Sequence, residues 1–187
     1  MSLVDSQVTL RPVAESDLGL LVRLFTDPAV VGESEWYGWQ DGRWLRHRWD
    51  ENGLLGDDGG TLLVDHAGET VGLVNWRKRP TGFRSWCWAI GVTLVPEARG
   101  HGYGTQVQRG LVHYLFAHTQ AIRIEAETDV TNAAEQRALQ KAGFTREGIL
   151  RSVVFRAGQW RDAVLYSILR DEAALDPATA QANLEQI

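Results

Sequence analysis

The stretch VPEARGHGYGTQVQRGLVHYLF, from Val95 to Phe116, decides how the chain is built and what kind of group it can bind. Three glycines, Gly100, Gly102 and Gly104, occupy alternate positions directly before a segment with helical spacing of apolar residues. Glycine lets the backbone turn, and the first turn of a helix exposes unpaired N–H groups at the positive end of the helix dipole. The stretch therefore predicts an anion-binding loop between a strand and a helix.

Length and composition bound the class of protein. The chain has 187 residues, 44% of them hydrophobic and 23% charged, which is typical of a globular domain and argues against a fibrous or disordered chain. We expect a single domain over residues 1–172 and a tail over 173–187. The net charge of −5 argues against nucleic-acid partners bound through a basic face, so an anionic ligand must be held by local groups.

The sequence lacks signals of export, membrane insertion and metal binding. The opening segment MSLVDSQVTLRP has no basic region followed by an apolar one, and no apolar run nears the roughly 20 residues of a membrane span. The single cysteine, Cys87, excludes an internal disulfide and a multi-cysteine metal site. The histidines show no metal-site spacing. We expect a cytoplasmic protein with no metal and no membrane partner.

Apolar periodicity around the glycine loop predicts alternating strands and helices. Strands are predicted over residues 7–11, 61–65, 70–77, 86–94, 122–128, 149–155 and 163–169. Helices are predicted between the N-cap Ser16 and Asp27, in the second half of 33–52 with an end near Gly53, over 104–118, and from 133 to an end at Gly143. The order β-α-α-β-β-β-α-β-α-β-β predicts an α/β (α+β) fold with helices on both faces of a mixed sheet.

The glycine loop alone has three readings. It is not a P-loop, because no Gly-Lys-Ser/Thr follows. A dinucleotide-binding loop would give a role to Glu125 and Glu127, about 20 residues further on, but the G-x-G-x-G spacing and the segment Val95–Arg99 between strand and turn argue against it. A solvated turn that caps a helix without any ligand stays open at this point.

The loop resembles the R/Q-x-x-G-x-G/A signature of the GNAT N-acetyltransferases, here as RGHGYG at 99–104. A second segment, NAAEQRALQKAGF at 132–144 followed by Glu147 and Gly148, resembles the family's N-x-x-S…K-x-G-F-x-x-E-G segment. The stretch RDAVLYS at 161–167 is similar to the closing strand of the RimJ/RimL-like branch, which acetylates N-terminal amines of ribosomal proteins among other substrates. The resemblance spans about residues 7–170 and implies a mostly antiparallel sheet of about seven strands.

The resemblance implies acetyl-CoA as co-substrate, with the pyrophosphate on the glycine loop. The expected contacts are main-chain N–H groups and one hydroxyl, from Gly100, Gly102, Gly104 and Thr105. Arg99 would add positive charge in an otherwise acidic chain. His101 and Tyr103 complete the cofactor-binding loop, and we expect their side chains to point outward.

The strand before the loop is implied to bind the pantetheine arm through its main chain. That function would fall to Val92 and Leu94, because the family's strand splays away from its neighbour at this place. A main-chain N–H near Val92 would contact the oxyanion of the reacting carbonyl. Such a donor would survive any side-chain substitution that preserves the strand.

Asn132 matches the family's asparagine beside the pantetheine, and it could also be a plain helix N-cap. Helical spacing places Glu135, Gln136 and Leu139 on the same face as Asn132. Gln136 is therefore a further candidate for cofactor binding. Lys141 falls on the other face, where we expect a solvated charge.

The proton-transfer residues depart from the resemblance. Leu139 stands where many members have a tyrosine that protonates the thiolate, Glu135 where the RimL-like branch often has serine, and Val154 where that branch can carry a carboxylate. Glu135 is the candidate substitute, because a partly buried carboxyl beside a thioester could shuttle a proton. The alternative is an exposed first-turn glutamate that favours the helix dipole.

The acceptor amine sets how strong a base is needed. An α-amine with a pKa near 8 is about a tenth neutral at pH 7, whereas a lysine amine near 10.4 is almost wholly charged. An α-amine would need only a water chain to Glu33, Glu35 or Glu135. The lack of an obvious strong base favours an α-amino or other acceptor of low pKa.

A tryptophan-rich stretch over 36–49 is the candidate wall of the acceptor site. Trp36 and Trp39 are the expected contacts, and Glu33 could attract a cationic amine. The alternative is that these aromatic side chains belong to the core.

The sequence thus predicts an N-acetyltransferase in which a primary amine, either an N-terminal α-amine or a small-molecule amine, attacks acetyl-CoA directly in a ternary complex. No covalent enzyme intermediate is expected, since Cys87 has no recognisable base beside it. Three alternatives stay open: another donor such as succinyl-CoA, a non-catalytic CoA-binding or partner-binding module, and a dinucleotide enzyme. An edge strand could pair in a homodimer.

Overall fold

The protein is described here by a computed structural model that covers residues 8–32 and 36–173. Its strands are β1 Thr9–Pro12, β2 Leu55–Gly56, β3 Gly59–His66, β4 Glu69–Pro80, β5 Trp86–Leu94, β6 Arg123–Asp129, β7 Thr145–Arg156 and β8 Gln159–Leu169. Its helices are α1 Leu18–Thr26, α2 Pro28–Val31, α3 Arg43–Asn52, α4 Tyr103–His118 and α5 Ala133–Ala142. The 3-10 turns Glu15–Asp17 and Pro96–Ala98 precede α1 and the glycine loop.

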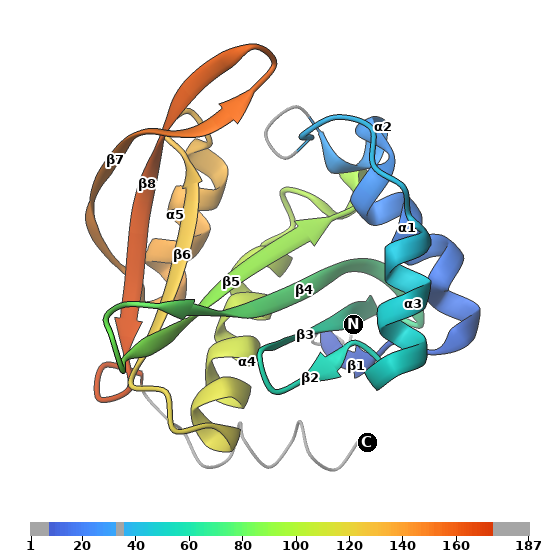
Figure 1. Ribbon diagram of the computed structural model, residues 1–187, viewed down its shortest axis with the longest axis horizontal. Helices are drawn as coiled ribbons and strands as arrows, with labels where there is room; N and C mark the ends of the chain where they lie inside the picture. Colours follow the sequence, from blue (N-terminus) through green and yellow to red (C-terminus); the bar gives the residue numbers. More distant parts are fainter. Residues whose placement is uncertain (1–7, 33–35, 174–187) are drawn as a thin grey trace, which may run out of the picture.

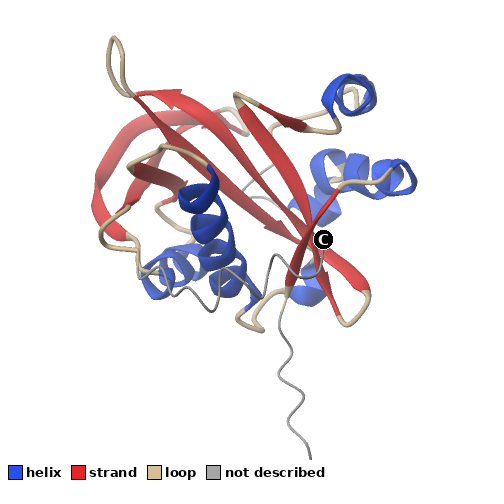
Figure 2. Cartoon of the chain, turned by 90° about the horizontal axis from the view of Figure 1, so that it is seen from below, coloured by secondary structure: helices blue, strands red, loops and turns tan. Residues whose placement is uncertain are grey.

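One sheet joins these strands in the order β1-β3-β4-β5-β6-β8-β7, with β2 paired to β3 off this path. Every pair is antiparallel except β5 with β6. Helices α4 and α5 cover one face of the sheet, and α1 to α3 lie on the opposite side, against β3 and β4 (Figures 1 and 2). The predicted mixed, mostly antiparallel sheet with helices on both faces is confirmed.

The element boundaries differ from the sequence prediction in a few places. Ser16 is not the N-cap of the first helix, because it lies inside a 3-10 turn whose last residue, Asp17, accepts the Ala14 N–H at 2.8 Å. The last hairpin also begins earlier than expected, at Thr145 instead of 149. Glycines Gly53 and Gly143 do end α3 and α5 in the left-handed conformation, as predicted.

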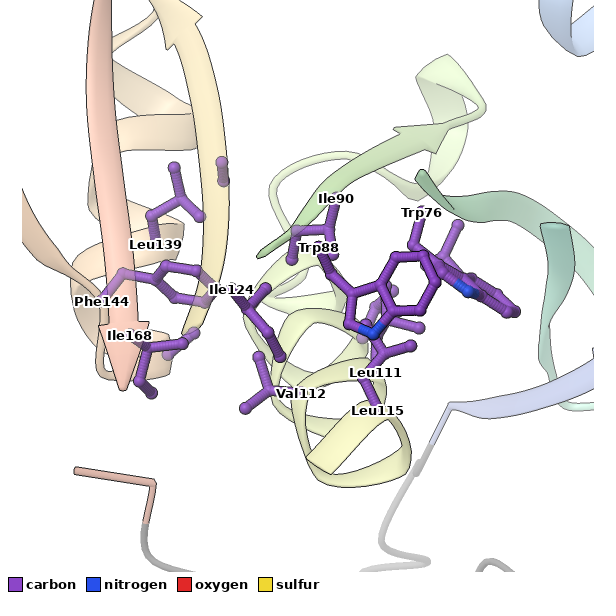
Figure 3. Packing of buried hydrophobic residues seen from close by; sticks show 14 of the residues in the cluster. Trp76, Trp88, Ile90, Leu111, Val112, Leu115, Ile124, Leu139, Phe144 and Ile168 are labelled. Atoms are coloured by element: carbon purple, nitrogen blue, oxygen red, sulfur yellow. The ribbon is translucent and has the colours of Figure 1, made fainter. Parts of the chain in front are cut away.

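The main core lies between the sheet and the helices α4 and α5 (Figure 3). Leu111 and Leu115 of α4 pack with Trp88 of β5, and both leucines are fully buried. Leu139 of α5 is also fully buried in this cluster, together with Phe144. The residue at the position of the family's tyrosine is therefore a core side chain.

A second core lies between the opposite face of β3 and β4 and the helices α1 and α3. Leu63 and Leu73 face away from the first core and are fully buried here. Leu21 and Leu45 bring α1 and α3 onto them. No helix of the described chain lies on the part of that face formed by β6, β8 and β7 (Figure 1).

The sheet opens between β5 and β6. Their parallel pairing is limited to Trp88–Ile90 with Ile124–Ala126. Beyond these residues β5 stays paired with β4 up to Leu94, while β6 stays paired with β8 up to Asp129. The two strands diverge there, with the glycine loop following β5 and α5 following β6 (Figure 1). No helix in the described chain combines the length and apolar character needed to cross a membrane.

Candidate acyl-transfer site

A cavity of about 480 Å³ lies where β5 and β6 diverge. It is lined by the end of β5, the glycine loop, the start of α4, one side of α5 and the end of α2. The lining therefore brings together two segments that the sequence linked to one ligand, the loop at 99–105 and the helix after Asn132.

The glycine loop lines this cavity and carries main-chain donors that have no main-chain acceptor in the described chain. Gly100 and Gly102 have φ of 81° and 83°, a conformation that side chains with a Cβ seldom adopt. Gly102 is the N-cap of α4, and the first N–H of the helix to find a main-chain acceptor is that of Gln106, on the Gly102 carbonyl at 3.4 Å. In the described chain, the N–H groups from Gly100 to Thr105 have no main-chain acceptor. Together with the helix dipole they form a site suited to an anion.

Arg99 lies at the rim of the cavity and organises it. Its Nε donates to the Leu94 carbonyl at 3.0 Å, and its Nη2 donates to the Val30 carbonyl at 2.5 Å. The guanidinium thereby ties the end of α2 to the end of β5, while its charge stays beside the glycine loop. The expected positive charge beside the glycine loop therefore agrees with the geometry. The structure shows in addition that Arg99 connects α2 to the end of β5.

The end of β5 turns main-chain groups toward the opening, where the Leu94 carbonyl is held by Arg99. The Val95 N–H bonds to the Val71 carbonyl at 2.9 Å, so antiparallel alternation turns the main-chain groups of Leu94 and Val92 away from β4. No strand of the described chain pairs with β5 on that side beyond Ile90. Val92 and Leu94 both line the cavity, as the sequence analysis expected for the strand that meets the acyl donor.

Two loop side chains lie outside the cavity. His101 is exposed and stacks on Tyr103 with ring centroids 5.6 Å apart, and Tyr103 in turn packs against His66 at 4.6 Å. The His101 side chain is exposed, as expected, whereas the expectation is wrong for Tyr103, which is partly buried against the main core. Neither residue lines the cavity. The Thr105 hydroxyl does line the cavity and lies 3.5 Å from the Ala138 carbonyl.

Asn132 is both a helix cap and a cavity residue. Its side-chain oxygen accepts the Glu135 N–H at 3.2 Å, and the residue lines the cavity. Gln136 corrects the expectation, because its amide donates to the Val130 carbonyl at 2.9 Å and its side chain is not in the lining. Lys141, expected on the far side as a solvated charge, is exposed but does line the cavity, as does Arg137.

Glu135 lines the cavity and is held from the core. Its Oε1 accepts a hydrogen bond of 2.5 Å from the Nε2 of Gln108, a residue of α4 that is only 1% exposed. The Oε1 of Gln108 is buried and has no hydrogen-bond partner in the described chain. A buried amide that uses one of its two ends fixes the carboxylate of Glu135 at the wall of the cavity. Sequence reasoning missed Gln108 because a glutamine on a buried helical stripe gives no functional signal.

A second cavity of about 400 Å³ lies on the face of the sheet opposite α4 and α5. It shares Val92, Asn132 and Val31 with the first, so the two meet at the opening between β5 and β6. Ala89 and Gly91 of β5 form part of its floor and leave room above the sheet. A group bound there would reach the first cavity across the opening.

The tryptophan-rich stretch meets this second cavity through other residues than expected. Tyr37 and Gln40 line it, whereas Trp36 and Trp39 do not. The two tryptophans contact each other edge to face at 5.8 Å, and Trp39 is 84% exposed. Glu33 and Glu35, the other expected acceptor-site residues, lie outside the described residues.

The floor of the second cavity carries ion pairs. Arg79 lies 3.1 Å from Glu125 and also pairs with Glu127, while Asp129 pairs with Arg156. Burial raises the pKa of Asp129, but hydrogen bonds from Thr131 and the charge of Arg156 outweigh it and hold that pKa below its usual value. These residues were not expected as a group, because they come from three strands.

Cys87 is a buried free thiol on the same face of β5 as Ala89 and Gly91, opposite Arg79 in the sheet. The side chain is fully buried, and burial together with the neighbouring Glu125 carboxylate raises its pKa to about 11. Glu125, from the neighbouring strand β6, is a carboxylate beside Cys87 that was not predicted from the sequence. A thiol with so high a pKa is a poor nucleophile at neutral pH, which fits the expectation of no covalent enzyme intermediate.

Known proteins match both the sequence and the fold. The model of the acetyltransferase (GNAT) domain matches residues 7–145. The uncharacterized N-acetyltransferase YoaA of Bacillus subtilis is 35% identical over 81 residues, 43% of this chain and 46% of YoaA, so the match spans about half of that relative. The uncharacterized N-acetyltransferase p20 of Bacillus licheniformis is 24% identical over 179 residues, which cover 92% of this chain and 98% of p20.

Solved structures share the fold at low sequence identity. Spermidine N-acetyltransferase from Vibrio cholerae, in complex with CoA and spermine, superposes with a TM-score of 0.74 at 20% identity, covering 89% of this chain and 98% of that one. RimL, the ribosomal L7/L12 α-N-protein acetyltransferase, in complex with CoA, gives 0.74 at 21%, covering 90% and 97%. Because the family model matches residues 7–145, which is most of this chain, the chain belongs to the GNAT acetyltransferase family.

Proposed function

We propose that the protein is an N-acetyltransferase that moves an acetyl group from acetyl-CoA to a primary amine. The observation that carries the proposal is the row of N–H groups from Gly100 to Thr105 at the start of α4, which have no main-chain acceptor in the described chain and lie beside the opening between β5 and β6. Such a row suits a pyrophosphate, and the cavity continues from it along the free edge of β5. Two proteins with this fold were solved in complex with CoA, which supports CoA as the ligand.

The reaction we propose is direct attack in a ternary complex. The amine nitrogen forms a bond to the thioester carbonyl carbon, the carbon–sulfur bond breaks, and the amine proton must leave while the thiolate gains one. The main-chain N–H of Val92 faces the opening and would stabilise the oxyanion. An enzyme thioester at Cys87 would need a thiolate that the high pKa of this buried thiol disfavours.

Glu135 is the residue we propose as proton carrier. Its carboxylate lines the donor cavity and is oriented by the Gln108 amide at 2.5 Å. Leu139 and Val154, which occupy the positions of the family's usual acid and carboxylate, cannot exchange a proton. Glu35 stays a sequence-based candidate for the base, as it lies outside the described residues.

The RimJ/RimL-like branch is a further proposal and rests on the segment RDAVLYS at 161–167. It implies an N-terminal α-amine as one acceptor class, with small-molecule amines as the other. The same two apolar positions, Leu139 and Val154, favour the second candidate function, a CoA-binding module without catalysis.

Two measurements separate these functions. Isothermal titration should show acetyl-CoA binding, and a free-thiol assay should show amine-dependent release of CoA from acetyl-CoA, faster than from succinyl-CoA. Binding without thiol release for any amine would favour the non-catalytic module. No binding of acetyl-CoA or CoA would contradict both functions.

A further inference from the structure

The second cavity has a floor built from side chains of three neighbouring strands. Strand alternation turns Arg77 and Arg79 of β4 and Glu125, Glu127 and Asp129 of β6 to the face opposite α4, where they line the cavity. Between them, β5 contributes only small side chains, Ala89 and Gly91. A ligand above β5 would therefore lie between charged groups on both sides.

The carboxylates of this floor are already neutralised. Glu125 lies between Arg79 at 3.1 Å and Arg123 at 2.7 Å, and Glu127 shares Arg79. On the far side, Asp129 pairs with Arg156 and has Arg161 at 3.9 Å. A cationic ligand would have to displace an arginine to reach any of these three carboxylates.

Arg77 differs from the other charged residues of the floor. It lines the cavity and is exposed, and within the described chain no carboxylate lies within ion-pair distance of it and no acceptor takes a hydrogen bond from it. In the register of the sheet Arg77 lies opposite Ala89, three residues along β5 from Val92. That separation is roughly 10 Å, before the reach of the arginine side chain is counted.

The balance of charges in the described lining also favours a ligand with a carboxylate over a polycation. The guanidiniums of Arg77, Arg79 and Arg156 match the carboxylates of Glu125, Glu127 and Asp129 in number, so the described lining carries no net negative charge. A polyamine carries several positive charges and binds best where carboxylates outnumber cations. A planar guanidinium without a partner suits a carboxylate instead.

We infer that the acceptor is a primary amine with a carboxylate within roughly 10 Å of the amine nitrogen, bound by Arg77, and not a polyamine. The inference rests on the proposed function, because it concerns the acceptor of that reaction. The amine lies at the opening beside Val92 and the carboxylate over Ala89. Two sources carry this chemistry, a free dicarboxylic amino acid and a peptide with an acidic residue after its free N-terminus.

The test is a thiol-release assay with acetyl-CoA and four acceptors: free glutamate, the peptide Ala-Glu-Ala-Ala amide, its Ala-Gln-Ala-Ala counterpart, and spermidine. We expect kcat/KM for the glutamate-containing peptide or for free glutamate to exceed that for the glutamine peptide and for spermidine by about tenfold. Turnover of free glutamate alone would identify a small-molecule acceptor, and turnover of the peptide would identify an N-terminal one.

Variants of Arg77 make the test specific. Arg77→Met should lower kcat/KM for the acidic acceptor by about tenfold and leave that for the glutamine peptide unchanged, and Arg77→Glu should reverse the preference toward spermidine. Arg48→Met, a change of the same kind on an exposed arginine of α3 outside the cavity, should alter neither. The CoA affinity should be the same in all of them.

The outcomes separate the inference from the proposed function. Spermidine as the preferred acceptor, or an equal loss for acidic and neutral acceptors in Arg77→Met, would overturn the inference and leave the acetyltransferase intact. A protein that binds CoA but releases no thiol with any acceptor would contradict the proposed function, and the inference would fall with it.

Discussion

The two cavities that meet between β5 and β6 are built in different ways. The first cavity, which we propose as the donor cavity, would bind an anion through the main chain of one contiguous stretch, Gly100 to Thr105, where the glycine positions and a following helix determine the geometry. The second cavity, which we propose as the acceptor cavity, takes its charged groups from side chains on β4, β6 and β7, which are far apart in sequence. A main-chain site of this kind tolerates side-chain change, whereas a side-chain site can change its ligand by single substitutions. The first should therefore report the family and the second the individual substrate.

The largest effect is expected at the main-chain site. Gly102→Val should weaken CoA binding by about a hundredfold, because a β-branched residue resists the left-handed conformation at φ 83° and will redirect the N–H groups at the start of α4. Isothermal titration with CoA measures the effect.

Gly68→Val is the matched control for strain. Gly68 has the same φ of 83°, lies in the turn between β3 and β4, and has no atom within 4 Å of an added Cβ, as for Gly102. Both variants should lose similar thermal stability, but Gly68→Val should bind CoA normally. Equal CoA affinity in the two variants would mean that the main chain at Gly102 does not hold CoA. The contrast between a main-chain site and a side-chain site would then fail.

The next effect concerns the one side chain through which the donor site would act chemically. Glu135→Gln should lower kcat by about tenfold and leave the CoA dissociation constant near normal, because the amide keeps the shape but cannot carry the proton. Glu97→Gln removes an equal charge from an exposed position close to the loop and outside the cavity, and should leave kcat unchanged. Wild-type turnover in Glu135→Gln would show that Glu135 carries no proton in the reaction and is only a charge in the first turn of α5.

A smaller effect is expected from the side-chain part of the donor cavity. Lys141→Met should weaken CoA binding about threefold at low salt, because an exposed charge beside an anion contributes little. The loss should shrink further as salt is raised. Lys78→Met, on a lysine paired with Asp58, serves as control. A hundredfold loss for Lys141→Met would mean that side chains, and not the main chain, hold the anion.

The smallest effect concerns Glu147 of β7, a residue to which we assign only a structural function. Hydrogen bonds from Arg123 and Ser167 lower the pKa of Glu147 from its ordinary value of 4.5 to about 2. The resulting stability is present above about pH 4.5 and is lost as pH falls toward 2. Glu147→Gln should therefore flatten the acid-side decline of the melting temperature, by a modest amount since the side chain is 37% exposed. An unchanged decline would contradict this linkage.

Much of the fold could be predicted from the sequence, because local patterns determine it. The order of the long strands and helices followed from apolar periodicity, and Gly53 and Gly143 ended their helices as expected. The short elements α2 and β2 escaped prediction, since four and two residues are too few to show a period. Ser16 was wrong as a cap because the 3-10 turn Glu15–Asp17 contains it and moves the N-cap position of α1 to Asp17.

The faces of α5 show why part of the site could not be predicted. The helical spacing was counted from Asn132, but this residue is the N-cap with φ −80° and ψ 70°, outside the helical conformation. The side of α5 that meets the cavity instead carries Ala134, Ala138 and Lys141. Gln136 bonds back to the end of β6. A shift at the helix start therefore exchanged the expected positions of Gln136 and Lys141.

The acceptor cavity needed the register of the sheet. Arg77 reaches the floor only because β4 pairs with β5 so that Arg77 lies opposite Ala89, and Asp129 meets Arg156 only because β7 folds back over β8. Neither pairing has a local sequence signal. Trp49 of the aromatic stretch packs against the second core and donates its indole N–H to the Val13 carbonyl, which supports the core alternative for this residue. Trp44 contacts Phe25 edge to face but is exposed.

The central claim is that main-chain N–H groups at the start of α4 hold the pyrophosphate of CoA. Titration of isotope-labelled protein with CoA, followed by amide NMR, tests it directly. The account predicts that the amide resonances of Gly102, Gly104 and Thr105 shift most, and that inorganic pyrophosphate alone shifts the same resonances. Saturable CoA binding that leaves these three amides in place would contradict it.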